Sequence, residues 1–175
     1  MDELFLDFLN TAWYIRHDAH ADPLCGSAWV KGVLEREKAV PLTAYEGERL
    51  IGLREALTAA ADQLIETGGL DDCQLAWLNG RLWEYPVCYH LAREGDEFRL
   101  TDQPQQDGLE YAEYLVLKSF AAFVASGLWR ILRRCGNADC RWFFVDHSKS
   151  HTRKWCGNTC ASLFKVRRHR ANKST

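Results

Sequence analysis

The 175-residue sequence lacks several features that mark large classes of proteins. It has no apolar run approaching 18 residues, so we expect no segment that spans a membrane. The acidic N-terminal segment, MDELFLDFLNT, has neither a basic region nor a small-residue cleavage site, so we expect no secretory signal and a cytoplasmic protein. With only four prolines and 47% apolar residues, the composition is that of a folded globular protein.

Motifs of common enzymes are also missing. The sequence contains no GxGxxG, no GxSxG and no Walker-type loop. The His/Cys-x-Glu signature of zinc deaminases does not occur near its cysteines. The carboxylates follow regular helix-surface patterns instead of forming an isolated pair. We therefore expect that the protein is not an enzyme.

Acidic residues are scarce in the last quarter of the chain. Residues 130–175 contain 12 Lys and Arg residues and two acidic residues, Asp139 and Asp146. Residues 1–129 contain 10 basic and 22 acidic residues, so the net charge of −2 averages two opposite parts. This asymmetry indicates a basic segment that binds a polyanion. Attraction between the two parts within the fold is the alternative.

Four of the seven cysteines form two close pairs with the spacing Cys135-x4-Cys140-x15-Cys156-x3-Cys160. Cysteines of a cytosolic chain stay reduced, and zinc prefers four tetrahedral thiolate or imidazole ligands. The spacing therefore predicts one zinc ion held by four thiolates, which is structural because no coordination position stays open for water. Four ordinary buried cysteines and a redox switch are the alternatives.

Other histidines and cysteines are weaker candidates for metal binding. His147 and His151 are substitute ligands by type, but we expect them in a turn that points away from the sulfurs. A loop cluster of His17, His20 and Cys25 has a plain polar loop as its alternative. The isolated cysteines are expected to be small buried apolar residues; they are Cys25, Cys73 and Cys88.

The sequence patterns predict a mainly α (α+β) fold in two parts. The body, residues 1–130, is expected to be a helical domain with one small β-hairpin at residues 87–102, around Glu94-Gly95-Asp96. Its helices are expected at residues 4–14, 28–39, 43–67, 71–83 and 109–133. The zinc module, residues 131–175, is expected to be treble-clef-like: a knuckle, a hairpin with strands 141–146 and 152–155, and a helix that begins near Cys156. So short a module buries little core, so zinc would supply stability.

Basic residues surround the predicted metal site. Each phosphate that a Lys or Arg neutralises releases condensed counterions, so such a cluster is expected to bind DNA with strong salt dependence. Arginine also suits bidentate contacts to phosphate or guanine. RNA, or a protein surface, remains an alternative partner, and the base sequence is not determined. The candidate nucleic-acid-binding residues are Arg153, Lys154, Lys165, Arg167, Arg168 and Arg170.

The C-terminal stretch CGNADCRWFFVDHSKSHTRKWCGNTCASLFKVRRHRA resembles the CGNR zinc finger. Its four paired cysteines match the metal ligands of that family, and Phe144 and Asp146 match its strand. The segment LFLDFLNTAW is similar to the opening of the ABATE-type domain that precedes the finger. The resemblance implies a bacterial stress-induced transcription regulator. The chain departs from the family by having Ala161-Ser162-Leu163 after the last ligand in place of Gly-Asn-Arg or Ala-Asn-Arg, and Arg167 and Arg168 are candidates to compensate.

The ABATE-like pattern Asp7-x-x-Asn10-Thr11 places polar groups inside an apolar opening. These three residues are candidates to line a pocket for a small-molecule effector. The alternative is that Asn10 and Thr11 cap or turn the chain and that Asp7 is solvated or paired.

Together these features predict a zinc-dependent DNA-binding transcription regulator whose body is a sensor or a homodimerisation domain. A zinc-stabilised protein-interaction module and a thiol redox sensor are the alternatives.

Overall fold

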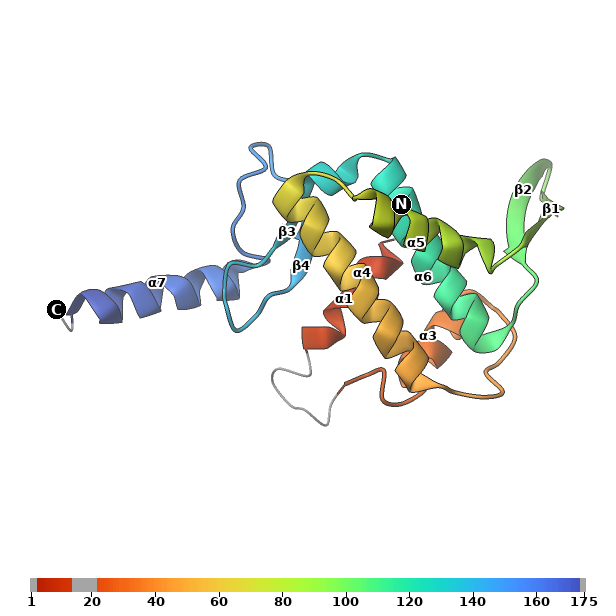
Figure 1. Cartoon of the computed structure of the whole chain (residues 1–175), viewed down its shortest axis with the longest axis horizontal. Coiled ribbons are helices and arrows are strands. Elements are labelled where there is room, and N and C mark those ends of the chain that lie inside the picture. Colours follow the sequence, from red (N-terminus) through yellow and green to blue (C-terminus); the bar gives the residue numbers. More distant parts are fainter. Residues whose placement is uncertain (1–2, 14–21, 174–175) are drawn as a thin grey trace.

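The structure, a computed structural model, describes residues 3–13 and 22–173 (Figure 1). Its helices are α1 (Leu4–Asn10), α3 (Ala28–Arg36), α4 (Gly47–Thr67), α5 (Asp72–Trp83), α6 (Gly108–Ala125) and α7 (Asn158–Lys173), with a 3-10 turn η1 (Leu128–Ile131). Strands β1 (Val87–Glu94) and β2 (Glu97–Pro104) form one antiparallel pair, and β3 (Leu132–Arg134) and β4 (Phe143–Val145) form another. The expected mainly helical fold with small hairpins is confirmed.

Helix α6 is the centre of the body and contacts α1, α3 and α5. The apolar opening of the chain packs on it: the Phe5 ring lies 4.6 Å from the ring of Phe123 and 5.5 Å from that of Phe120. Both rings of α6 and Phe5 itself are almost fully buried. Burial of aromatic side chains contributes most to such a core. Helix α1 is therefore fixed in the middle of the molecule (Figure 1).

The apolar face predicted for the long second-quarter helix is buried in α4. Its buried positions follow three- and four-residue steps, at Leu50, Leu53, Leu57, Ala60, Ala61 and Leu64. The helix begins at Gly47, four residues later than expected, and ends at Thr67; the following Gly68 has a φ of 78°, which favours glycine.

The last helix of the body is shorter than the predicted range of 109–133. Helix α6 ends at Ala125, and Gly127 reverses the chain direction with a φ of 77° before η1 and β3. Leu132, beyond Gly127, belongs to strand β3 and not to the helix. It pairs with Val145 of β4 and is fully buried. Periodicity alone could not distinguish this strand from a helical continuation.

The hairpin expected in the zinc module has a different partner strand. β4 pairs with β3, which precedes the knuckle, and residues 152–155 form no strand. The zinc knuckle (residues 135–140) therefore lies within the connection of this hairpin. Residues 152–155 instead run beside the knuckle, where the Gly136 amide donates to the Lys154 carbonyl oxygen at 2.7 Å.

The hydrophobic core is continuous from the body into the zinc module. Leu132, Phe143 and Val145 belong to the same buried cluster as the side chains of α1, α4 and α6. Strand β3 contacts α4, and β4 contacts α1. The boundary predicted at residue 130 is thus crossed by a shared core, which holds the start of the finger rigidly on the body.

The isolated cysteines were expected to be buried, and this prediction is wrong. Cys25, Cys73 and Cys88 are all exposed. Cys73 lies in the first turn of α5, and Cys88 lies on the face of the β1–β2 hairpin that also carries His90. Lone cysteines carry no periodic signal of their own, so the sequence could not place them.

Helix α7 extends from the molecule as a separate arm, at the end opposite the β1–β2 hairpin (Figure 1). Its side chains Cys160, Phe164 and Arg167 contact the zinc module, as described below. Among the described residues, no helix combines the length and the apolar character needed to cross a membrane.

Candidate metal centre, basic helix and pocket

The side chains of Cys135, Cys140, Cys156 and Cys160 converge on one point. Their sulfur atoms all lie within 4.8 Å of one another, and three of the four residues are buried. The distance is 3.7 Å between the sulfurs of Cys140 and Cys156 and 3.8 Å between those of Cys156 and Cys160. A tetrahedron with Zn–S bonds of about 2.3 Å has edges of about 3.8 Å. The four thiols therefore fit a tetrahedral zinc ion.

Backbone hydrogen bonds shape the knuckle that carries the first pair. The Cys135 amide donates to the Trp142 carbonyl oxygen at 2.8 Å, and the Cys140 amide donates to the Asn137 carbonyl oxygen at 2.9 Å. A Cβ at Gly136 would lie 3.1 Å from the Lys154 oxygen, so this close approach favours glycine.

Asn137 links the knuckle to α7. Its buried amide Nδ2 donates to the sulfur of Cys160 at 3.6 Å. Burial raises the pKa of the Cys160 thiol, but hydrogen bonds from Asn137 and the neighbouring thiols outweigh it and lower the pKa. Burial also raises the pKa of Cys140 and Cys156. A divalent cation would reverse this effect, so metal binding would release protons.

The sequence predicted a helix that begins near Cys156 and carries both cysteines of the second pair. In the structure, only Cys160 lies on this helix. Helix α7 begins at Asn158, and Cys156 lies in the turn before it. The sulfur of Cys156 still reaches the cluster because the chain turns at Gly157, whose carbonyl oxygen accepts the amide of Ala161.

Asp146 organises the loop that leads to the second pair. Its side chain is fully buried; Oδ1 accepts the Ser148 amide at 3.0 Å and Oδ2 accepts the Arg153 amide at 2.8 Å. Burial would raise the pKa of this carboxyl, but these hydrogen bonds lower it to about 2. The sequence marked Asp146 only as the end of a strand; its position directly after β4 is a signal for such a turn.

Two of the six predicted nucleic-acid contacts support the metal site. The Arg153 guanidinium donates to the Cys156 carbonyl oxygen at 2.8 Å and lies over the Phe144 ring. Arg167 pairs with Asp139 of the knuckle at 2.5 Å. Both arginines therefore brace the finger, although both remain exposed enough to contact a ligand.

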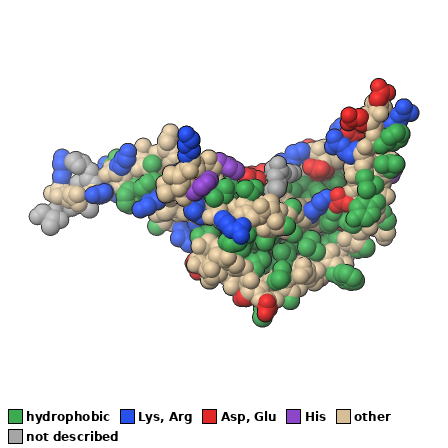
Figure 2. All heavy atoms as spheres, turned by 90° about the horizontal axis from the view of Figure 1, so that it is seen from above, with side chains coloured by type: hydrophobic (Ala, Val, Ile, Leu, Met, Phe, Trp, Pro, Cys, Tyr) green, Lys and Arg blue, Asp and Glu red, His purple; other side chains and the backbone are tan. Residues whose placement is uncertain are grey.

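The other four predicted contacts lie on the surface. Lys154, Lys165, Arg168 and Arg170 are exposed. Lys165 and Arg168 are three residues apart and share one side of α7. Residues 147–173 contain no Asp or Glu, and Figure 2 shows Lys and Arg side chains spread along the arm that α7 forms.

Leu163 and Phe164, two apolar side chains of α7, pack beside the metal site only in part. The Phe164 ring lies 5.2 Å from that of Trp155, and Leu163 lines a cavity of about 420 Å³ beside the cysteines. Both side chains remain 44% exposed. The beginning of α7 is therefore attached to the finger by a small apolar contact as well as by Cys160.

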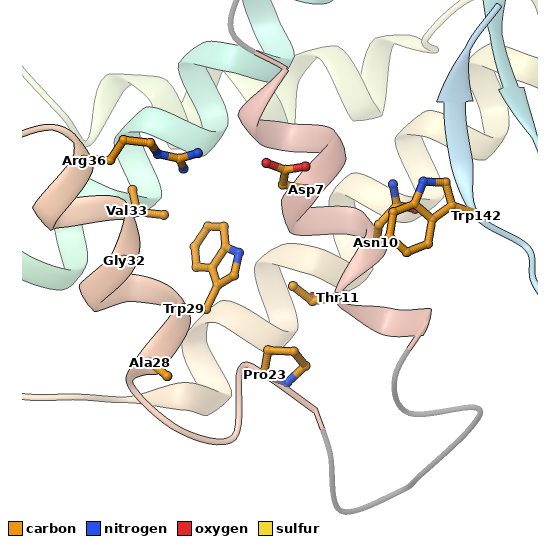
Figure 3. Close-up of a pocket in the computed structure, with 10 residues that line it drawn as sticks. All are labelled: Asp7, Asn10, Thr11, Pro23, Ala28, Trp29, Gly32, Val33, Arg36 and Trp142. Atoms are coloured by element: carbon orange, nitrogen blue, oxygen red, sulfur yellow. The ribbon is translucent and has the colours of Figure 1, made fainter. Parts of the chain in front are cut away.

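A second cavity, of about 540 Å³, lies between α1, α3 and Trp142 of the zinc module. It brings together Asp7, Asn10 and Thr11, as the pattern suggested. Figure 3 shows the Asp7 carboxylate and the Arg36 guanidinium at one side of the cavity, with the Trp29 ring below them.

Two of the three predicted pocket residues form hydrogen bonds with other parts of the protein. Asn10 donates from Nδ2 to the Phe143 carbonyl oxygen at 3.0 Å and accepts the Phe143 amide at 2.8 Å. Thr11 donates to the Phe8 carbonyl oxygen and accepts from buried Arg54, which also pairs with Asp22. Thr11 makes a local contact of the kind expected if it turns the chain, whereas Asn10 bonds to the distant strand β4 and does not cap or turn its own helix.

Comparison with known families bears on the whole chain. Residues 2–129 match the family described as "Putative stress-induced transcription regulator" (ABATE), and residues 131–173 match the CGNR zinc finger. The chain belongs to the ABATE family. Curated proteins include no match to it. The CGNR match and the four adjacent sulfurs together assign one zinc ion to the cysteine cluster.

After its last ligand, Cys160, the zinc finger of this ABATE protein has an apolar residue at the position where the CGNR family has arginine. Leu163, the third residue of Ala161-Ser162-Leu163, faces the cavity beside the cysteines. Arg167, one turn later, contacts Asp139, whereas Arg168 is exposed without a partner among the described residues. Of the two arginines considered as replacements, Arg168 is therefore the one left available.

Sequence reasoning missed three residues that line the pocket: Trp29 and Arg36 of the ABATE domain and Trp142 of the zinc finger. Trp29 and Arg36 lie on α3, and Trp142 follows the knuckle, so only the tertiary fold brings them to α1. The sequence pattern that could have indicated two of them is the seven-residue spacing of Trp29 and Arg36, which places both on one face of a helix. His17 and His20 lie outside the described residues.

Proposed function

We propose that this ABATE protein is a zinc-dependent DNA-binding transcription regulator. The observation that carries the proposal is α7: a basic helix anchored on the zinc site, extending from the body, with no acidic residue on it. A helix of this kind can lie along a groove or a phosphate backbone. The acidic body does not compete for it, because the exposed part of the helix extends away from the body (Figure 1).

In this function, the groups near the metal hold α7 in a fixed position on the zinc finger. Zinc, when bound, holds Cys160 and thereby the first turn of α7. Arg167 and Asn137 fix the helix to the knuckle, and Arg153 fixes the preceding turn. Exposed Lys165 and Arg168 then contact phosphates. Four thiolates saturate the coordination of zinc, so we assign it no catalytic role.

Titration of the zinc-loaded protein onto random-sequence duplex DNA at several salt concentrations tests the proposal. Each phosphate contact contributes about −0.9 to the slope of log K against log salt. The double variant Lys165→Ala/Arg168→Ala is expected to bind more weakly and to flatten this slope by about 2. The control Lys31→Ala/Arg99→Ala removes the same charge from exposed sites on α3 and on the polar face of the β1–β2 hairpin and should leave the slope unchanged.

A zinc-stabilised protein-interaction module is the second candidate. It is favoured by apolar side chains exposed on α7: Leu163 and Phe164 at 44% and Val166 at 47%. Absence of DNA binding at low salt, from protein with one zinc per chain, would contradict the DNA-binding proposal. Docking through an apolar patch would depend only weakly on salt.

We also propose that the cavity between α1 and α3 takes a small-molecule effector. Asp7 and Arg36 are exposed, and neither has an ion-pair partner among the described residues. With Trp29 and Trp142 as aromatic walls, the cavity suits an aromatic molecule that carries an amine and a carboxylate. Because Trp142 follows Cys140 by two residues, an occupant would contact the finger as well as the body.

Thermal unfolding with phenylalanine, phenylacetate or phenethylamine as probe tests the effector site. Phenylalanine is expected to raise the melting temperature most, because it can meet both charges. Arg36→Gln should remove the effect of phenylacetate, and Asp7→Asn that of phenethylamine. The exposed-residue variant Glu55→Gln serves as control. No shift with any of the three probes would contradict this assignment.

A further inference from the structure

The β1–β2 hairpin has one apolar and one polar face. In its register Leu91 pairs with Leu100 and Arg93 pairs with Phe98, and directly paired residues share a face. Alternation along β1 adds Val87 and Tyr89 to this apolar face. The opposite face carries polar pairs such as His90 with Thr101. This is the pattern of a hairpin that covers a hydrophobic core.

The apolar face of the hairpin covers little of its own chain. Tyr89 is 74% exposed, Phe98 67%, Leu100 63% and Leu91 61%. The hairpin rises away from the body (Figure 1), and Figure 2 shows hydrophobic side chains along its outer side. An isolated two-stranded hairpin is marginally stable in water, and a contiguous exposed apolar patch marks an interaction site.

We propose that this face packs against the same face of a second copy of the chain and forms a two-fold symmetric homodimer. Trp83, which precedes β1 by four residues, is a further apolar side chain that is 89% exposed. An aromatic side chain presents about 150–250 Å². Val87 and the four side chains above expose on the order of 500 Å², so two copies would bury about 1,000 Å² in total, the lower bound for a specific interface.

Charges do not oppose this packing. The charged residues of the apolar face, Arg93 and Asp102, are already engaged within the chain. The Arg93 guanidinium lies over the Phe98 ring and donates to the Gly95 carbonyl oxygen. Asp102 accepts from Tyr114 and pairs with Lys118. A two-fold interface brings a surface against itself, so a mainly apolar face whose two charged side chains are already engaged within the chain is self-complementary.

The molar mass of the zinc-loaded full chain, measured by light scattering over a range of concentrations, tests the proposal. The chain has a mass of 20.1 kDa, and the wild type is expected at twice this value. The variant Leu91→Lys/Leu100→Glu makes the face polar, while its opposite charges form a cross-strand pair that preserves the hairpin. It is expected at the monomer mass.

The control His90→Lys/Thr101→Glu places the same charges on the neighbouring pair, on the opposite face. It is expected to remain dimeric. A monomeric wild type, or a dimer that persists in the Leu91/Leu100 variant, would overturn the proposal. Zinc content and DNA binding through α7, at the other end of the molecule, report on the regulator function separately.

Discussion

At the scale of single residues, Asn10 joins the two parts of the chain. Its amide makes two hydrogen bonds with the backbone of Phe143, 133 positions away, and it is 5% exposed. The sequence offered Asn10 either as a ligand contact or as a cap of α1. Neither describes its bonds, because the partner strand β4 is identified only by the fold. An Asn in an apolar helix indicated a special role without indicating the partner.

Replacing Asn10 by alanine is expected to destabilise the protein by about 3 kcal/mol. The change leaves a buried amide and a buried carbonyl of Phe143 without partners, and each unsatisfied group costs about 1–3 kcal/mol. Urea unfolding of the zinc-loaded protein measures the difference. Asn79→Ala, on the exposed surface of α5, is the control and should change stability by less than about 0.5 kcal/mol. Equal effects of the two changes would contradict the role assigned to Asn10.

At the scale of elements, helices with a continuous apolar face were the most predictable. The face of α4 follows from its sequence because the stripe repeats over the whole helix. Strand pairing was not predictable to the same degree. Residues 152–155 seemed the natural partner of the strand at 141–146 because they follow it closely, yet the buried Leu132 and Val145 pair across β3 and β4. Apolar burial against α1 and α4 decides this pairing.

Zinc is expected to control whether α7 is helical. The helix has 16 residues, and Cys160, Phe164 and Arg167 attach it to the zinc module. Most helical stability in proteins comes from tertiary packing, so α7 depends on the contacts that attach it to the zinc module. The variant Cys140→Ser should lose zinc and reduce the helical circular dichroism signal, whereas Cys73→Ser, at an exposed cysteine, should retain both. Full helicity without zinc would contradict this dependence.

At the scale of the whole molecule, the charge asymmetry becomes an arrangement in space. Helix α7 lies at one end and the β1–β2 hairpin at the other (Figure 1). The asymmetry of the sequence therefore appears as an acidic body from which the basic helix α7 extends. Local ion pairs do join the acidic and the basic part of the chain, such as Arg134 with Asp62 of α4. A homodimer through the hairpins would leave both basic arms free.

The sequence by itself determined the helical class of the body, the four zinc ligands and the basic character of the C-terminal helix. These features are local: a helical stripe, two cysteine pairs and a run of basic residues each occupy neighbouring positions in the chain. Only the tertiary structure decided the pairing of β3 with β4, the roles of Asn10 and Arg167, and the cavity shared by α1, α3 and Trp142. Each of these depends on contacts between distant segments, which are set by how the whole chain buries its apolar side chains.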